Sequence, residues 1–315
     1  MQRSVTHVVK AHRQLEGAGF TVRRPFPSSN VLGEQFDPFL LLDHMGPMYA
    51  APGEAVGAPW HPHRGFATVT YLLEGEMRHR DSAGNQGTLR PGDFQLMVAG
   101  AGVVHDESPS ESVMKHGGTN EGFQIWVNLR AADKMCAPSY QDYNGDAIPT
   151  FKGDRFTAKV AAGSAFGLQG PVELPSVPFQ FVDVHATAGA VVLHELPSTM
   201  SLGIYVYRGE AVFGEFGETA GEGHFVVMQE GDESATSSTK ARIAVPSGTC
   251  QFLLLAGTPL REPMARYGPF VMNTRAEIER AFADYNAGNF GKIPATFKSR
   301  TQHTDAFDPS VHKIV

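Results

Sequence analysis

The stretch FATVTYLLEGEMRHRDSAGNQGTLRPGDFQLMVAGAGVVHDES, residues 66–108, decides the fold class of this chain. It is made of short runs rich in β-branched and aromatic residues, which are typical of strands. Gly, Pro, Asn and Asp interrupt these runs about every eight to twelve residues, which is the turn spacing of β-sandwiches and barrels. We therefore predict a β-barrel in this part of the chain.

The second half of the chain has the same pattern of short apolar runs separated by turn residues. The runs AGAVVLHELP (188–197), SLGIYVYRGEAVFG (201–214) and TCQFLLLAG (249–257) are apolar and end at turn residues. Gly-Glu follows an apolar run at 75–76 and again at 209–210. The two positions lie 134 residues apart, and a repeat of that length indicates a duplicated domain rather than a solenoid. We predict an all-β chain with one barrel in residues 1–135 and a second in residues 136–315.

One segment near the end of the chain has a helical pattern. In TRAEIERAFADYNAGNFG (274–291) the apolar residues are spaced as on one helix face. These residues are Ile278, Ala281, Phe282 and Tyr285. Thr274 and Glu277 are spaced as a capping box, and Gly288 is a stop signal. We predict a short helix that packs on the outside of a barrel, with the tail returning to pack on the barrels.

Composition argues against several classes of partner. The formal net charge is -7, and the 26 Lys and Arg residues are scattered rather than gathered in a basic stripe, so we expect no direct contact with nucleic acid. No apolar run approaches the ~18 residues of a membrane span, and the first residues lack a signal-peptide pattern. Two cysteines, Cys136 and Cys250, do not make a disulfide framework. We expect a cytoplasmic protein.

Two pairs of candidate metal ligands have the spacing of strand neighbours. His61 and His63 form one pair, and His105 and Glu107 form the other. Because residues i and i+2 of a strand project from the same face, each pair can point into the barrel. Three imidazoles and one carboxylate would then converge. This set contains the two histidines and one carboxylate that suit ferrous iron, and it also suits Mn, Ni, Cu or Zn.

The second barrel lacks this set of ligands. Aligning the Gly-x-x-His corner that ends at His105 with the second half places Gln251 at the histidine position. His194 and Glu195 are neighbours in sequence, so they face opposite sides of a strand. We interpret the second barrel as structural.

The motifs resemble those of the pirin family of the cupin superfamily. The matching segments cover nearly the whole chain. They are DPFLLLDHMGP (37–47), HPHRGFATVTYLLEG (61–75), HRDSAGNQGTLRPGDFQLMVAGAGVVHDESPSE (79–111), GFQIWVNL (122–129) and GPFVMNTRAEIERAFADYNAGNFG (268–291). The resemblance implies a bicupin, with two face-to-face barrels (double-stranded β-helices) and one metal in the first. The family's ligands fall on His61, His63, His105 and Glu107. Fe(II) is the expected metal, and Mn, Ni, Cu, Co or Zn suit the same site.

The resemblance implies two classes of function. The first is a quercetin 2,3-dioxygenase, a non-haem iron oxidoreductase that opens a flavonol or related enol-bearing aromatic with O2. The second is an iron-dependent, redox-sensing regulator that binds a protein partner without turnover. For the enzyme, we expect Glu107 to act as general base, and Phe39, Phe66 and Met97 to form an apolar wall for a small aromatic substrate. We expect a monomer.

Two positions depart from the family pattern. Ala67 stands where the family typically has Glu, and Leu96 stands where it typically has Trp. If either side chain lined the metal cavity, the cavity would be larger or less polar than in typical members, and Ala67 would remove a carboxylate from it.

Overall fold

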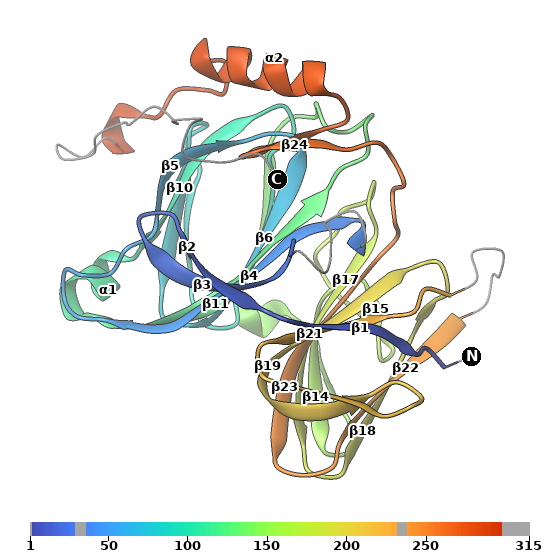
Figure 1. Cartoon of the computed structure of the whole chain (residues 1–315). Coiled ribbons are helices and arrows are strands. Elements are labelled where there is room, and N and C mark those ends of the chain that lie inside the picture. The colour runs from blue at the N-terminus through green and yellow to red at the C-terminus, as the bar shows by residue number, and fades with distance from the viewer. Residues whose placement is uncertain (1, 29–35, 232–237, 298–315) are drawn as a thin grey trace. The chain divides into compact units, whose positions relative to one another are not determined.

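A computed structural model describes residues 2–28, 36–231 and 238–297 of the chain (Figure 1). The described chain divides into two compact units. The first, here called the N-terminal barrel, contains Gln14–Val22, Met45–Asp142 and the described residues from Arg261 on. The second, here called the C-terminal barrel, contains the described residues up to Arg13, Arg23–His44 and Tyr143–Leu260. Strands dominate both units, which confirms the all-β prediction.

The N-terminal barrel is built on two antiparallel sheets. The smaller sheet has the order β5-β10-β7-β8, and the larger has the order β12-β9-β6-β11-β4-β3-β2. The strands are β2 (His12–Glu16), β3 (Phe20–Phe26), β4 (Phe39–Ala50), β5 (Ala58–His63), β6 (Phe66–Glu74), β7 (Met77–Asp81), β8 (Gln86–Leu89), β9 (Phe94–Val98), β10 (Val103–Pro109), β11 (Gly118–Asn128) and β12 (Ser139–Tyr143). The division between the two units falls within β2, β3, β4 and β12. The short helix α1 (Glu111–His116) follows β10.

The C-terminal barrel has one ten-stranded sheet and a two-stranded one. The main path of the large sheet is β1-β21-β19-β23-β17-β14-β13, with β18, β20 and β22 attached to it. The elements are β1 (Val5–Lys10), η2 (Gly145–Ala147), β13 (Thr150–Lys152), β14 (Phe156–Ala162), β15 (Ser164–Ala165), β16 (Leu168–Gln169), β17 (Phe179–Thr187), β18 (Ala190–Pro197), β19 (Ser201–Phe213), β20 (Glu218–Gly221), β21 (His224–Met228), β22 (Ser238–Val245) and β23 (Thr249–Gly257). Its interior is a continuous apolar cluster that includes Val184, Ile204 and Leu254.

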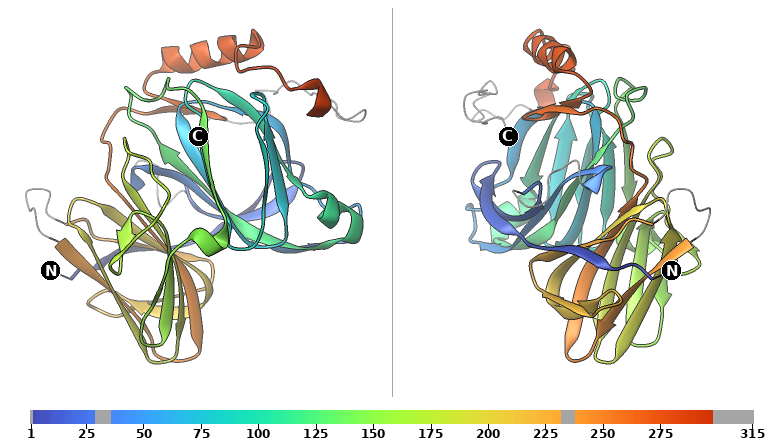
Figure 2. Two further views of the ribbon diagram at one scale, coloured as in Figure 1. Left: turned by 180° about the vertical axis from the view of Figure 1, so that it is seen from behind. Right: turned by 45° about the vertical axis from the view of Figure 1, so that its right-hand side comes forward.

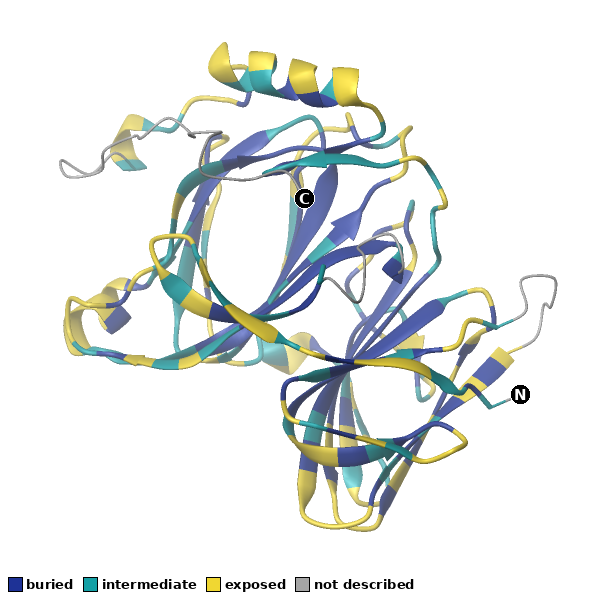
Figure 3. Cartoon of the chain, viewed as in Figure 1, coloured by how far each residue is buried: buried dark blue, intermediate teal, exposed yellow. Residues whose placement is uncertain are grey.

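The larger sheet of the N-terminal barrel has two chemically different faces. Strand register pairs Thr70 with Gln95 on one side and with Gln124 on the other, so these polar residues share one face. Apolar residues such as Val69 and Ile125 alternate with them and form the opposite face. Figure 3 shows that both kinds of position are largely buried along these strands. The polar face is therefore an interior one, and it faces the candidate ligands described below.

The C-terminal segment returns to the N-terminal barrel. Strands β24 (Ala265–Tyr267) and β25 (Phe270–Met272) lead into α2 (Arg275–Asn286), and η3 (Ala295–Phe297) follows. Helix α2 lies along these strands in all the views (Figures 1 and 2). Thr274 and Glu277 form a capping box, as predicted. Ile278 and Ala281 are buried while the outer face of the helix is exposed, which confirms the predicted amphipathic helix.

The structure bears on the other predictions to different degrees. The predicted boundary between residues 135 and 136 lies close to the 142/143 junction, but the first strand belongs to the C-terminal barrel and α2 to the N-terminal one. The prediction for the tail falls on residues 298–315, outside the described part. Cys136 and Cys250 are both free thiols. Within the described residues, no helix combines the length and apolarity needed to cross a bilayer.

Candidate metal centre

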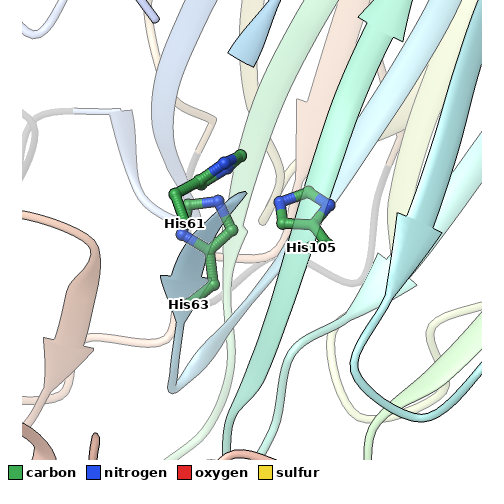
Figure 4. A group of neighbouring side chains, drawn as sticks. All are labelled: His61, His63 and His105. Carbon is green, nitrogen blue, oxygen red and sulfur yellow. The ribbon is translucent and has the colours of Figure 1, made fainter. Parts of the chain in front are cut away.

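Three histidines converge in the N-terminal barrel. His61 and His63 lie on β5, and His105 lies on the neighbouring strand β10, directly opposite His61. Their candidate ligand nitrogens all lie within 4.8 Å of one another. The three rings lie close together at steep angles to one another (Figure 4), with centroids 4.3 to 5.0 Å apart. The i, i+2 spacing and the antiparallel pairing of the two strands together account for this arrangement.

The histidines are held in the neutral form that binds metals. Burial lowers the pKa of His61, and it lowers those of His63 and His105 well below the usual range, with the neighbouring histidines adding to the effect. His61 Nδ1 lies 2.7 Å from the carbonyl oxygen of Pro59. Because a carbonyl only accepts, Nδ1 must carry the proton, which leaves the Nε2 lone pair of His61 free for a metal.

Buried nitrogens without partners also fit a metal. Nδ1 of His63 and both ring nitrogens of His105 are buried and make no hydrogen bond within the described residues. Such groups cost free energy unless something binds them. Nitrogen donors at this separation suit Fe, Co, Ni, Cu or Zn. The donor set therefore fits a transition metal ion.

Glu107 follows His105 by two residues on β10 and has hydrogen-bond partners of its own. Its carboxylate accepts hydrogen bonds from Thr70 Oγ1 (3.3 Å) and Gln124 Nε2 (3.2 Å). The group of close ligand atoms consists of the three histidines without Glu107. Burial raises the pKa of Glu107 to about 7. Its role as a fourth ligand remains a prediction.

Aromatic residues form one wall beside His63. The ring of Phe66 lies 5.0 Å from the ring of His63, and it stacks on Trp126 at 4.2 Å. The indole of Trp126 is itself 5.2 Å from His63, and the guanidinium of Arg266 lies over it at 4.8 Å. Phe66 was a predicted pocket residue, and its contacts agree with a place at the metal centre.

The other two predicted pocket residues have different surroundings. Met97 is buried and packs with Ala99 and Val103, on the sheet face that carries Thr68. Phe39 belongs to the C-terminal barrel, where it packs against Phe36 and Phe179. Its contacts there give no support to a role at the metal centre.

Ala67 and Leu96 do not line the metal cavity. Ala67 alternates with Phe66 and Thr68 along β6, and Leu96 pairs with Val69 on the apolar face of the sheet. Both are fully buried on the face opposite the histidines. The condition under which these substitutions would alter the cavity is therefore not met, because strand alternation turns both side chains away from the histidines.

An apolar cavity of about 70 Å³ lies within the N-terminal barrel, and Glu107 forms part of its wall. Its apolar lining includes Met45, Met48, Leu72 and Met77. The charged residues in the lining are all carboxylates, namely Glu76, Glu107 and Glu121. Glu107 is thus a residue of the strand of His105 that lines an apolar space, and this space is smaller than the ~300–1,000 Å³ of typical ligand pockets.

No direct signal in the sequence marked Thr70, Gln124 and Trp126 as residues of the site. All three lie on strands that were predicted, and their alternation with apolar residues could have placed them on an interior face. What the sequence could not show is which face turns toward the histidines.

The C-terminal barrel contains no equivalent of this centre among the described residues. Gln251 accepts a hydrogen bond from Arg208 at 3.2 Å, and its neighbours Cys250 and Phe252 belong to the apolar interior. His194 is buried against Gln180, whereas Glu195 is exposed on the other side of β18. The prediction that these two residues face opposite sides is confirmed.

Comparison with known proteins identifies the family. Residues 19–127 match the family description "Pirin", and residues 181–291 match "Pirin C-terminal cupin domain". The chain belongs to the pirin family. A pirin-like protein of Solanum lycopersicum is 36% identical over 92% of this chain and 93% of its own length. Pirin of Homo sapiens is 36% identical over 95% of this chain and 98% of its own.

Solved structures agree with this assignment. A structure of quercetin 2,3-dioxygenase from Acinetobacter baumannii has a TM-score of 0.86 and 34% identity. The match covers 93% of this chain and all of that one. The two-domain cupin fold that the sequence motifs implied is thereby confirmed.

Proposed function

We propose that this pirin is an iron-dependent dioxygenase that opens a flavonol of the quercetin type, or a related enol-bearing aromatic, with O2. One observation carries the proposal: three neutral histidines, of which His63 and His105 are buried and His61 is half-buried, converge in the N-terminal barrel, and Glu107 on the strand of His105 lines an apolar cavity. Similarity to a quercetin 2,3-dioxygenase over nearly the whole chain supports the same reaction class.

In this proposal, His61, His63 and His105 hold Fe(II), with Glu107 as the fourth ligand. The bound metal supplies a Lewis acid and a route for electrons to O2. A site of this kind also accepts Mn, Co, Ni, Cu or Zn, so iron is the specific part of the proposal.

Glu107 is assigned the proton transfer. A flavonol must lose its hydroxyl proton to become electron-rich enough to react with O2. Burial raises the pKa of Glu107 to about 7 in the metal-free chain, and a bound divalent ion would lower it again, so the carboxylate would be ionised at neutral pH and able to accept a proton. Thr70 and Gln124 hold the carboxylate in place by hydrogen bonds. The carboxylate oxygens of Glu107 are therefore already oriented when one of them accepts the proton.

The remaining residues bind the substrate and exclude water. Phe66 and Trp126 stack on each other beside His63 and keep water from that side of the centre. The methionines and Leu72 of the cavity suit an uncharged aromatic body. The carboxylates in the lining disfavour an anionic substrate.

The test is aerobic incubation of the Fe-loaded protein with quercetin and a panel of other flavonols. We expect loss of the visible absorbance of the flavonol and release of carbon monoxide, with no such change for metal-free protein. Equal rates for loaded and metal-free protein across the panel would contradict the proposal. The regulatory role implied by the family resemblance would then be the remaining candidate.

A further inference from the structure

The turn that follows His63 is held by the C-terminal segment. Arg64, the next residue, is buried, and its Nε donates to the carbonyl oxygen of Ala101 at 2.7 Å. Its Nη1 donates to Asp284 on α2 at 2.8 Å. The guanidinium also lies 4.4 Å from the ring centroid of Phe290. One side chain therefore connects the strand of His63, the corner before β10 and helix α2.

The backbone of the same turn is held as well. The N–H of Val271 donates to the carbonyl of Arg64 at 3.1 Å. The buried ammonium of Lys134 donates to the carbonyls of Gly65 (2.7 Å) and Val271 (3.0 Å), and to Asn128 (2.5 Å). A Cβ on Gly65 would lie 2.0 Å from the oxygen of Val271. The approach of β25 to this turn leaves no room for a side chain.

The strand that carries His105 also contacts the C-terminal segment. Ser82 Oγ donates to the carbonyl of Phe290 at 2.6 Å and accepts from the N–H of Val104, the residue before His105. Val104 packs in one apolar cluster with Phe290 and the buried face of α2. A Cβ on Gly102 would lie 2.8 Å from the ring of Phe290. Phe290 thus contacts the supports of both ligand-bearing strands.

We propose that residues 268–291, here called the clamp, fix the relative position of His63 and His105 from outside the barrel. Arg64, Asp284 and Phe290 are its positioning residues. The affinity and coordination geometry of the metal then depend on contacts that touch no ligand. This inference rests on the metal centre of the proposed function, and it assigns the C-terminal helix a role in that centre.

The physical basis is the sensitivity of metal sites to their supports. Groups that orient ligands typically change metal affinity 10–100-fold. The charged contact between Arg64 and Asp284 lowers the pKa of Asp284, as expected for an ion pair that remains formed at neutral pH.

The experiment measures Co(II) binding to the full-length protein, by chelator competition and by the visible spectrum of bound Co(II). The test variant is Asp284→Asn, which keeps the size of the side chain and removes its charge. Asp284→Glu restores the charge, and Phe290→Leu perturbs the other contact while remaining apolar. The matched control is Glu279→Gln, on the exposed face of the same helix, where Glu279 forms an exposed ion pair with Arg275.

We expect Asp284→Asn and Phe290→Leu to weaken Co(II) binding about 10-fold and to shift the Co(II) spectrum. Asp284→Glu should recover most of the affinity, and Glu279→Gln should match the wild type. Wild-type affinity and spectrum in both test variants would overturn the clamp, even if their melting temperatures fall, because that result would make these contacts merely structural. Absence of Co(II) binding by the wild type would instead contradict the metal centre itself, and with it the clamp.

Discussion

His105 and His194 are both buried histidines with lowered pKa values, yet their surroundings give them different roles. His105 lies among other histidines and lacks hydrogen-bond partners within the described chain. His194 lies in the apolar interior of the C-terminal barrel, where Nε2 is 2.8 Å from Gln180 Oε1. Strand spacing predicted the convergence of the first and the isolation of the second. It could not predict that Ala67 faces away, because the family pattern places that residue near the metal without stating a face.

His194 should make the protein sensitive to acid. Burial lowers its pKa to about 4 in the folded protein, below the value of ~6.5 in an unfolded chain. Stability that is present above about pH 6.5 is therefore lost as the pH falls toward 4. For His194→Gln we expect the loss of unfolding free energy between pH 7 and pH 4.5 to be smaller than in the wild type by about 2–3 kcal/mol. Urea unfolding at both pH values measures this, and identical losses in the two proteins would refute it.

Glu107→Gln tests the proton transfer. The amide keeps the size of the side chain but cannot accept the hydroxyl proton of a flavonol, so we expect turnover to fall about 100-fold or more. Glu111→Gln is the control, because Glu111 is an exposed carboxylate at the start of α1. Stopped-flow loss of quercetin absorbance, with metal content measured in parallel, gives the result. A variant that retains its metal and full activity would show that Glu107 is not the base.

At the scale of elements, the strands and the helix followed from local pattern, but the shift in register between β5 and β10 did not. His105 is opposite His61, and the register then shifts so that Glu107 lies opposite Ala58. A bulge alters where one side chain points without changing the sequence period. Here the extra residue lies on β5, because two steps along β10 match three steps along β5, and β10 stays in regular register with β7. The spacing predicted four converging ligands, whereas the structure groups three histidines and shows Glu107 bonded to Thr70 and Gln124.

Helix α2 begins with a capping box that should contribute measurably to stability. Thr274 Oγ1 accepts from the backbone N–H of Glu277, and the Glu277 carboxylate accepts from that of Thr274. Thr274→Ala should lower the free energy of unfolding by about 1 kcal/mol. Arg275→Ala should change it by less than about 0.5 kcal/mol, since its ion pair with Glu279 is exposed. Equal effects of the two substitutions in urea titrations would contradict the capping argument.

At the scale of the whole molecule, the sequence predicted two barrels but not which chain ends belong to which. Strand β1 pairs with β21 in the C-terminal barrel, while β24, β25 and α2 belong to the N-terminal one. Local patterns specify an element but not its distant partner, so a contiguous division at residue 135 was the simplest expectation. The interior of the C-terminal barrel is filled by apolar side chains, which agrees with the interpretation of this barrel as structural. A cytoplasmic location and a monomeric state remain predictions.

The central claim is that one metal ion binds where His61, His63 and His105 meet. Metal analysis of protein purified without added metal, followed by Fe(II) titration, tests it most directly. His105→Ala is the test variant, and His194→Gln is the control because it alters a buried histidine of the other barrel. The account predicts one ion per chain for the wild type and for His194→Gln, and less than about a tenth of an ion for His105→Ala. A wild type that binds no ion, or a His105→Ala variant that still binds one, would contradict it.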